Sequence, residues 1–100
     1  MKALVFHGPK CLAFEDRPKP AIVQATDAIV RITTTTICGT DLHIQKGDVP
    51  TIADGRILGH EGVGIIEEVG ASVLDFHEGD KVLISLITSC GRCRFCKKGM

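Results

Sequence analysis

Aromatic residues, net charge and long hydrophobic runs are all scarce in this sequence of 100 residues. It has no tryptophan, no tyrosine and four phenylalanines, so its core must be largely aliphatic. Twelve basic residues balance twelve acidic ones, which argues against a partner that is nucleic acid or a membrane surface, since both attract a basic excess. No apolar run approaches the roughly 18–20 residues of a membrane span, and Met1–Phe6 is too short for an export signal.

Cysteine is present in an odd number, five, and three of the five cysteines lie at positions 90, 93 and 96. A secreted disulfide framework usually has an even number and follows an export signal. We therefore expect a reducing, cytoplasmic location, in which this spacing gathers thiolates on one metal ion. Residues 90–100 also carry four basic side chains and no acidic one, and such cations stabilise thiolates around zinc.

Residue types along the chain favour β structure, because β-branched residues are concentrated in runs separated by glycine and proline. The sequence predicts strands at Ala3–Phe6, Cys11–Glu15, Asp27–Cys38, Gly62–Val69 and Lys81–Ile87, a short helix at Gly39–Gln45 and a polar loop at Asp48–Arg56. We expect one mainly β (α+β) domain over residues 1–100, a partly open β-barrel with one or two short helices. Cys11 should be buried in its strand, and His7 and His77 should be surface residues in turns.

The run Cys38-Gly39-Thr40-Asp41-Leu42-His43 lies where a strand ends and a helix begins. A helix N-terminus favours a thiolate at Cys38, which is a good ligand for zinc. The Thr40 hydroxyl can accept and donate a proton, and the His43 imidazole can carry that proton to solvent. Taken alone, the run fits equally well a small buried cysteine followed by a Thr/Asp helix start.

The run Gly59-His60-Glu61-Gly62-Val63-Gly64 offers an imidazole nitrogen and a carboxylate within reach of one metal ion. Asp41 could hold the other nitrogen of His60 and so fix its tautomer. The glycines let the backbone pass close to its neighbours. A His-Glu pair on a glycine-rich turn is the alternative interpretation, but it leaves the surrounding motifs unexplained.

A third run follows these two along the chain, Cys90-Gly91-Arg92-Cys93-Arg94-Phe95-Cys96. The pattern Gly59-His60-Glu61-x-x-Gly64-x5-Gly70-x2-Val73 resembles the signature of the zinc-containing alcohol dehydrogenases of the medium-chain dehydrogenase/reductase family. The run that begins at Cys38 is similar to the first zinc-ligand motif of that family. The cysteine-rich run resembles its structural-zinc lobe, which we expect to begin at about residue 88. The resemblance covers essentially the whole chain and implies a GroES-like barrel.

The resemblance implies a catalytic zinc site and a reaction. Cys38 and His60 would bind the zinc, Glu61 would lie beside it as an alternative or transient ligand, and Asp41 would support His60. Zinc would act as a Lewis acid on a small alcohol, which is oxidised to an aldehyde or ketone as hydride passes to NAD or NADP. Related enzymes form dimers or tetramers, so a homo-oligomer is expected of the complete enzyme.

The resemblance also assigns a proton relay and a second metal site. Thr40 would contact the alcohol and begin the relay, with His43 further along it. Cys90, Cys93 and Cys96 would be three ligands of a structural zinc.

Several parts of such an enzyme are not among these residues. A closed structural zinc site needs four ligands, and a catalytic site has three protein ligands and an open position. We therefore expect the fourth structural cysteine and the third catalytic ligand beyond Met100. No Gly-x-Gly-x-x-Gly follows a strand, so the Rossmann domain and the cofactor-binding residues are missing. The sequence is expected to be the N-terminal portion of a dehydrogenase, inactive by itself.

Two alternatives come from other functional classes. A co-chaperonin shares the barrel fold and has nearly this length, but it has no use for Cys-x-x-Cys-x-x-Cys or Gly-His-Glu. A free-standing structural zinc module fits the basic, cysteine-rich end but leaves Cys38, Thr40, His43 and His60 unexplained. Metal content separates the three hypotheses, with two zinc ions per chain in the complete enzyme, one in a module and none in a co-chaperonin.

Overall fold

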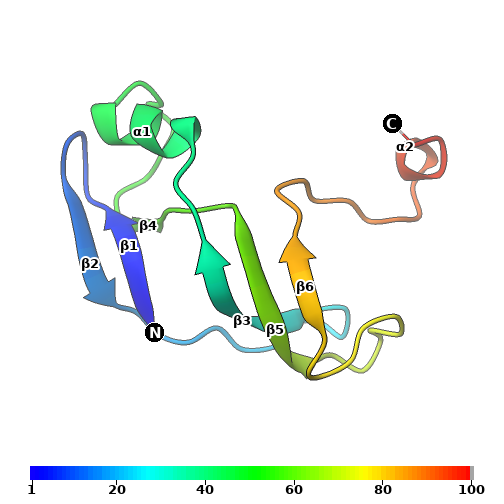
Figure 1. Ribbon diagram of the computed structural model, residues 1–100. Helices are drawn as coiled ribbons and strands as arrows, with labels where there is room; N and C mark the ends of the chain where they lie inside the picture. The colour runs from blue at the N-terminus through cyan, green and yellow to red at the C-terminus, as the bar shows by residue number, and fades with distance from the viewer. Residues whose placement is uncertain (100) are drawn as a thin grey trace.

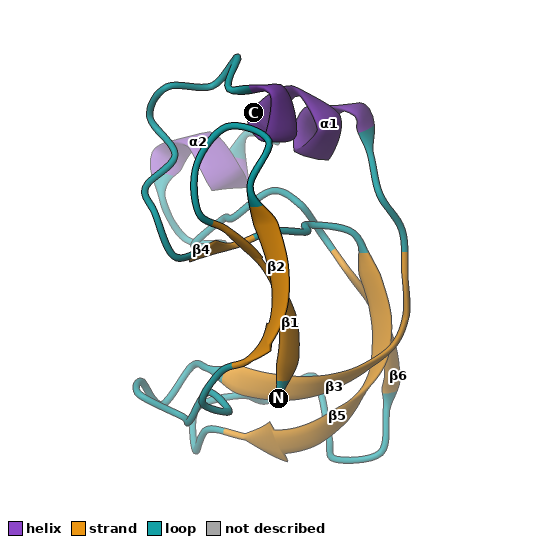
Figure 2. Cartoon of the chain, turned by 90° about the vertical axis from the view of Figure 1, so that its left-hand side faces the viewer, coloured by secondary structure: helices purple, strands orange, loops and turns teal. Residues whose placement is uncertain are grey.

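The computed structural model describes residues 1–99, which form six strands and two short helices. In chain order these are β1 (Lys2–Phe6), β2 (Leu12–Asp16), β3 (Ala28–Thr35), α1 (Gly39–Lys46), β4 (Arg56–Ile57), β5 (Gly62–Val69), β6 (Lys81–Ile84) and α2 (Arg94–Lys97). The strands make two antiparallel sheets of three, in the orders β2-β1-β4 and β3-β5-β6 (Figures 1 and 2). The two sheets do not close into a barrel within residues 1–99. The expected mainly β, partly open architecture with two short helices is thus confirmed.

The first sheet is built on β1, whose side chains alternate between more exposed and buried from Lys2 to Val5 and which ends in the buried Phe6. It pairs with β2 in a hairpin and with the two-residue β4 at Val5 and Phe6. The prediction that Cys11 is buried in a strand is wrong, since Cys11 is exposed. Its N–H donates to the Gly8 carbonyl over 2.9 Å, so Cys11 belongs to the turn that precedes β2.

The second sheet is centred on β5, whose bounds are those predicted from the sequence. The strand predicted over Asp27–Cys38 ends earlier, at Thr35, because Thr35 pairs with Gly62, the first residue of β5. For the same reason the strand predicted over Lys81–Ile87 ends at Ile84, which also pairs with Gly62. The common start of the pairing at Gly62 therefore fixes where two neighbouring strands end.

The core is small and aliphatic apart from one phenylalanine. Its buried hydrophobic residues are Ala3, Val5, Phe6, Ile29, Ile44 and Ile66, of which Val5 is fully buried. A cavity of about 430 Å³ is lined mainly by apolar side chains of β1, β2, β3 and α1, among them Leu4, Phe14 and Leu42. Neither α1 nor α2 has the length and apolarity that a helix needs to cross a bilayer, and residues 1–99 contain no other helix.

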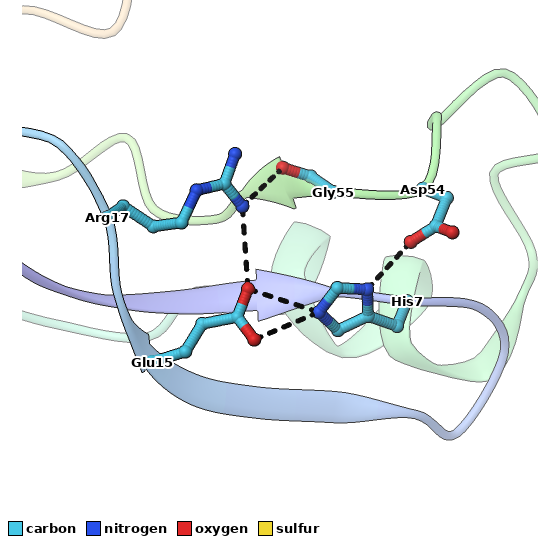
Figure 3. Close-up of polar contacts among 5 residues, drawn as sticks. All are labelled: His7, Glu15, Arg17, Asp54 and Gly55. Carbon is cyan, nitrogen blue, oxygen red and sulfur yellow. Dashed lines mark hydrogen bonds and ion pairs between the residues drawn. The ribbon is translucent and has the colours of Figure 1, made fainter.

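A polar cluster around His7 ties the first hairpin to the segment that precedes β4 (Figure 3). The ring Nδ1 lies 2.7 Å from Asp54 Oδ1, and the ring Nε2 lies 3.2 Å from both carboxylate oxygens of Glu15. Arg17 Nη1 donates to the Gly55 carbonyl over 3.2 Å and lies 3.5 Å from Glu15 Oε1. His7 was predicted as a surface residue, and its partner Asp54 lies 47 positions away in the sequence. The hydrogen bonds to Asp54 and then to Glu15 raise the pKa of His7 above its ordinary value of 6.5.

This cluster predicts a pH-dependent contribution to stability. Because the pKa of folded His7 is raised, the contribution is fully present below pH 6.5 and is lost as the pH rises through the folded value. His7→Asn should therefore lower the thermal midpoint more at about pH 5 than at about pH 9. His77→Asn is the matched control, since the His77 side chain is 79% exposed and lies 3.9 Å from Asp80. Equal losses for His7→Asn at both pH values would contradict the prediction.

Candidate functional site

Cys38 and His60 lie next to each other at one end of the second sheet although they are 22 positions apart in the sequence. Thr35 at the end of β3 pairs with Gly62 at the start of β5. Cys38 therefore follows one strand and His60 precedes the other at the same end of the sheet, next to α1 (Figure 1). Cys38 Sγ lies 3.0 Å from His60 Nε2, and both residues are half-buried. A soft sulfur and an imidazole nitrogen thus converge on one point.

Asp41 completes this group from the first turn of α1, where Cys38 is the N-cap residue. Its Oδ2 accepts the Cys38 backbone N–H over 3.1 Å, which holds the carboxylate under the cysteine. Its Oδ1 is buried and has no hydrogen-bond partner among the residues that the structure describes. One donor atom each from Cys38, Asp41 and His60 lie within 4.8 Å of one another.

The unpartnered oxygen of Asp41 indicates whether the group formed by Cys38, Asp41 and His60 can accommodate a metal ion. A buried carboxylate oxygen without a donor is unfavourable, and a nearby cation relieves that cost. Sulfur, imidazole nitrogen and carboxylate oxygen are also the ligand types that zinc takes in proteins. The three residues therefore fit a zinc ion. The hydrogen bond predicted between Asp41 and His60 is not formed within residues 1–99, where the carboxylate binds the Cys38 backbone instead.

Glu61 lies at the outer side of this group. Its Oε1 is 3.9 Å from His60 Nε2, and its side chain is 41% exposed. The carboxylate therefore lies beside the His60 nitrogen that faces Cys38 Sγ, outside the group formed by Cys38, Asp41 and His60.

Thr40 and His43 both lie exposed on α1 and are three residues apart, so they are neighbours on the helix surface. No hydrogen bond joins the two side chains in the described part of the chain. The His43 ring instead approaches Asp48, with 3.2 Å between Nδ1 and Oδ2. Sequence reasoning did not identify Asp48, although its position directly after the helix-ending Gly47 is a signal that could have been used.

Cys90, Cys93 and Cys96 form a second group around α2. Cys93 Sγ and Cys96 Sγ are 3.4 Å apart, and Cys90 Sγ lies 3.9 Å from Cys96 Sγ. The backbone N–H groups of Arg92 and then Cys93 lower the pKa of Cys90 to about 7. The backbone N–H of Cys96 lowers the pKa of Cys93 in the same way. Cys90 and Cys93 are therefore biased toward the thiolate form that binds metal ions.

Comparison with known proteins shows the family of the chain. Residues 24–100 match the family described as the alcohol dehydrogenase GroES-like domain. The chain is 42% identical over 97 residues to the uncharacterized zinc-type alcohol dehydrogenase-like protein AdhB of Bacillus subtilis, covering 97% of this chain and 26% of that protein.

Solved structures add likeness in three dimensions. The apo form of zinc dependent alcohol dehydrogenase 2 from Streptococcus pneumonia is 61% identical, with a TM-score of 0.93 over 99% of this chain and 28% of that one. Alcohol dehydrogenase TADH from Thermus sp. ATN1 is 37% identical, with a TM-score of 0.92 over 98% of this chain and 28% of that one. The chain thus spans about a quarter of the length of these relatives. With a family match over residues 24–100, the chain belongs to the alcohol dehydrogenase GroES-like domain family.

Proposed function

We propose that this chain is the N-terminal catalytic portion of a zinc-dependent alcohol dehydrogenase that oxidises a small alcohol to an aldehyde or ketone with NAD or NADP. One observation carries the proposal. Cys38 Sγ lies 3.0 Å from His60 Nε2, and Asp41 in the same group has a buried oxygen without a hydrogen-bond partner among the described residues. Two relatives support it, since AdhB of Bacillus subtilis is described as a zinc-type alcohol dehydrogenase-like protein and the Streptococcus structure as a zinc dependent alcohol dehydrogenase. The Rossmann domain of the family is not among these residues, so cofactor binding falls to another part of the enzyme.

In this proposal Cys38 and His60 would hold the catalytic zinc, and Glu61 would lie beside it as an alternative or transient ligand. Zinc supplies Lewis-acid polarisation of the alcohol oxygen when it is bound. Asp41 holds the Cys38 backbone in place and compensates the positive charge of the metal ion. The third protein ligand would come from outside these residues, since a catalytic zinc has three protein ligands and this proposal assigns Asp41 to the Cys38 backbone and not to the metal ion.

Two residues of α1 would carry the proton of the alcohol to solvent. The Thr40 hydroxyl accepts it while passing its own proton toward His43, which releases a proton to solvent. Both side chains are exposed on the same helix surface, so the relay needs only a rotamer change or one bridging water.

We further propose that residues 1–100 form one partial domain whose structural-zinc lobe begins at about residue 88. Cys90, Cys93 and Cys96 supply three of its four ligands. We place the enzyme in the cytoplasm, because reduced thiols at this lobe are required for metal binding. We also propose that the complete enzyme is a homo-oligomer, a dimer or tetramer, as in related enzymes.

The relay is tested by His43→Ala in the full-length dehydrogenase. We expect alcohol oxidation to fall by up to about a hundredfold near neutral pH, where solvent hydroxide is scarce, with partial recovery at high pH. Lys46→Ala, at the exposed last residue of the same helix, is the control and should leave the profile unchanged. A pH–rate profile for His43→Ala that runs parallel to that of the wild type at every pH would exclude His43 from the relay.

A further inference from the structure

We propose that His7 is a protonation switch, which in its charged form holds the loop between α1 and β4, residues 48–55, against the first hairpin and in its neutral form releases it. The proposal does not depend on the proposed function, since His7 lies outside both groups of candidate metal ligands. The observation is the position of the ring between two carboxylates, with Asp54 at Nδ1 and Glu15 at Nε2 (Figure 3).

The middle of this loop has few other attachments to the fold. None of residues 48–55 is buried, so no side chain anchors the loop in the core. Among residues 1–99, the main-chain hydrogen bonds of residues 49–54 are local and join positions three apart. The contact of Asp54 with His7 is the one polar contact that joins residues 49–54 to another segment of the described chain. The order of the loop therefore depends on this contact.

Both ends of the loop are fixed independently of His7. The Lys10 N–H donates to the Gln45 carbonyl over 2.6 Å, which attaches the hairpin turn to the last turn of α1. The Gly55 N–H donates to the Phe6 carbonyl over 2.8 Å, next to the pairing of β1 with β4. Between these two attachments lies a cavity of about 180 Å³ that is lined by residues of both the hairpin turn and the loop. Loss of the contact in the middle can therefore release the loop while α1 and β4 stay in place.

The chemistry of the imidazole makes this contact depend on pH. An ionised carboxylate only accepts hydrogen bonds, so both ring nitrogens must carry protons for both contacts to form, and that form of the ring is the cation. A neutral imidazole has one N–H and can donate to one carboxylate only. Donation to Glu15 leaves Asp54 without a donor, whereas donation to Asp54 leaves a nitrogen lone pair facing the carboxylate of Glu15. Either tautomer therefore weakens the arrangement that holds the loop.

The charges around the ring set the direction of the switch. The ring contacts Asp54 from the loop and Glu15 from β2, and Arg17, which follows β2, lies 3.5 Å from Glu15. Charged His7 and Arg17 together balance the two carboxylates, whereas neutral His7 leaves one negative charge in excess. The hydrogen bonds to Asp54 and then to Glu15 raise the pKa of His7 above 6.5. The loop is therefore held below pH 6.5 and is released as the pH rises through the folded value.

Amide hydrogen exchange in the full-length dehydrogenase tests the switch at the peptide that covers residues 49–54. After correction for intrinsic exchange, protection of this peptide should fall about two- to fivefold between about pH 6 and about pH 9, the size of effect that one ion pair near the surface gives. His7→Asn and Asp54→Asn should each show the low protection at both pH values. The double variant should match the single ones, because both changes remove one contact. His77→Asn is the control and should behave as the wild type, since His77 is 79% exposed and lies 3.9 Å from Asp80.

A fall in protection that is confined to this peptide and absent in His7→Asn and Asp54→Asn supports the switch. Equal protection of the wild-type loop at both pH values would overturn it, and so would Asp54→Asn with the pH dependence of the wild type. A fall of equal size in peptides throughout the chain would also overturn it, because it would report the stability of the whole fold. None of these outcomes bears on metal binding or alcohol oxidation, so the proposed function is tested separately.

Discussion

Replacing Cys38 with serine in the full-length dehydrogenase is expected to reduce alcohol oxidation by about a thousandfold or more. A neutral hydroxyl is a poor zinc ligand compared with a thiolate, and a Lewis acid contributes several kcal/mol to the lowering of a barrier. Cys38 is half-buried at the start of α1, and serine is close to it in size, so the fold should persist. Steady-state turnover with circular dichroism as a check on folding measures this expectation.

Cys11→Ser is the matched control for Cys38→Ser. Cys11 is exposed and lies in the turn before β2, outside both cysteine groups that could hold a metal ion. Its replacement should leave turnover unchanged. A similar loss of turnover in both variants would show that the effect of Cys38→Ser is not caused by the loss of a metal ligand.

Replacing Gly64 with alanine should lower the stability of the fold more than the same replacement at Gly62, the other glycine of β5. A Cβ at this position would lie 2.4 Å from the Arg31 carbonyl oxygen and 2.5 Å from Val30 Cγ1. Because β3 and β5 are hydrogen-bonded there, the main chain itself must move. We expect a cost of about 3 kcal/mol and a thermal midpoint lower by about 10 °C or more.

Gly62→Ala on the same strand provides the comparison. The nearest atom to a Cβ at Gly62 is Ile32 Cδ1 at 3.2 Å, the far end of a side chain that can rotate away. Its cost should therefore be well below that of Gly64→Ala. Equal midpoints for the two variants would mean that the close approach of β3 to Gly64 is not a determinant of stability.

The elements that depend on local sequence could be predicted, and those that depend on pairing could not. Strand β5 is an apolar run with spaced glycines, and its bounds of Gly62–Val69 were predicted correctly. The sequence predicts a polar loop that ends at Arg56 and assigns Ile57 to no element, because only the pairing with Val5 and Phe6 makes these two residues a strand. Cys11 was misplaced for a related reason, since the turn from Gly8 is fixed by main-chain hydrogen bonds that composition does not encode.

The candidate site shows the same division. Motif spacing was enough to nominate Cys38, His60 and the three clustered cysteines, because the residue types themselves carry the metal chemistry. The orientation of the Asp41 carboxylate and the contact between His43 and Asp48 were missed. Both depend on how the ends of α1 are capped, and several capping arrangements are compatible with one sequence.

Metal content of the purified full-length dehydrogenase tests most directly the central claim that Cys38 and His60 hold a metal ion. Inductively coupled plasma mass spectrometry should find about two zinc ions per chain in the wild type and about one in Cys38→Ser, because only the catalytic site is lost. Cys38→Ser with both zinc ions retained and turnover unchanged would contradict the claim.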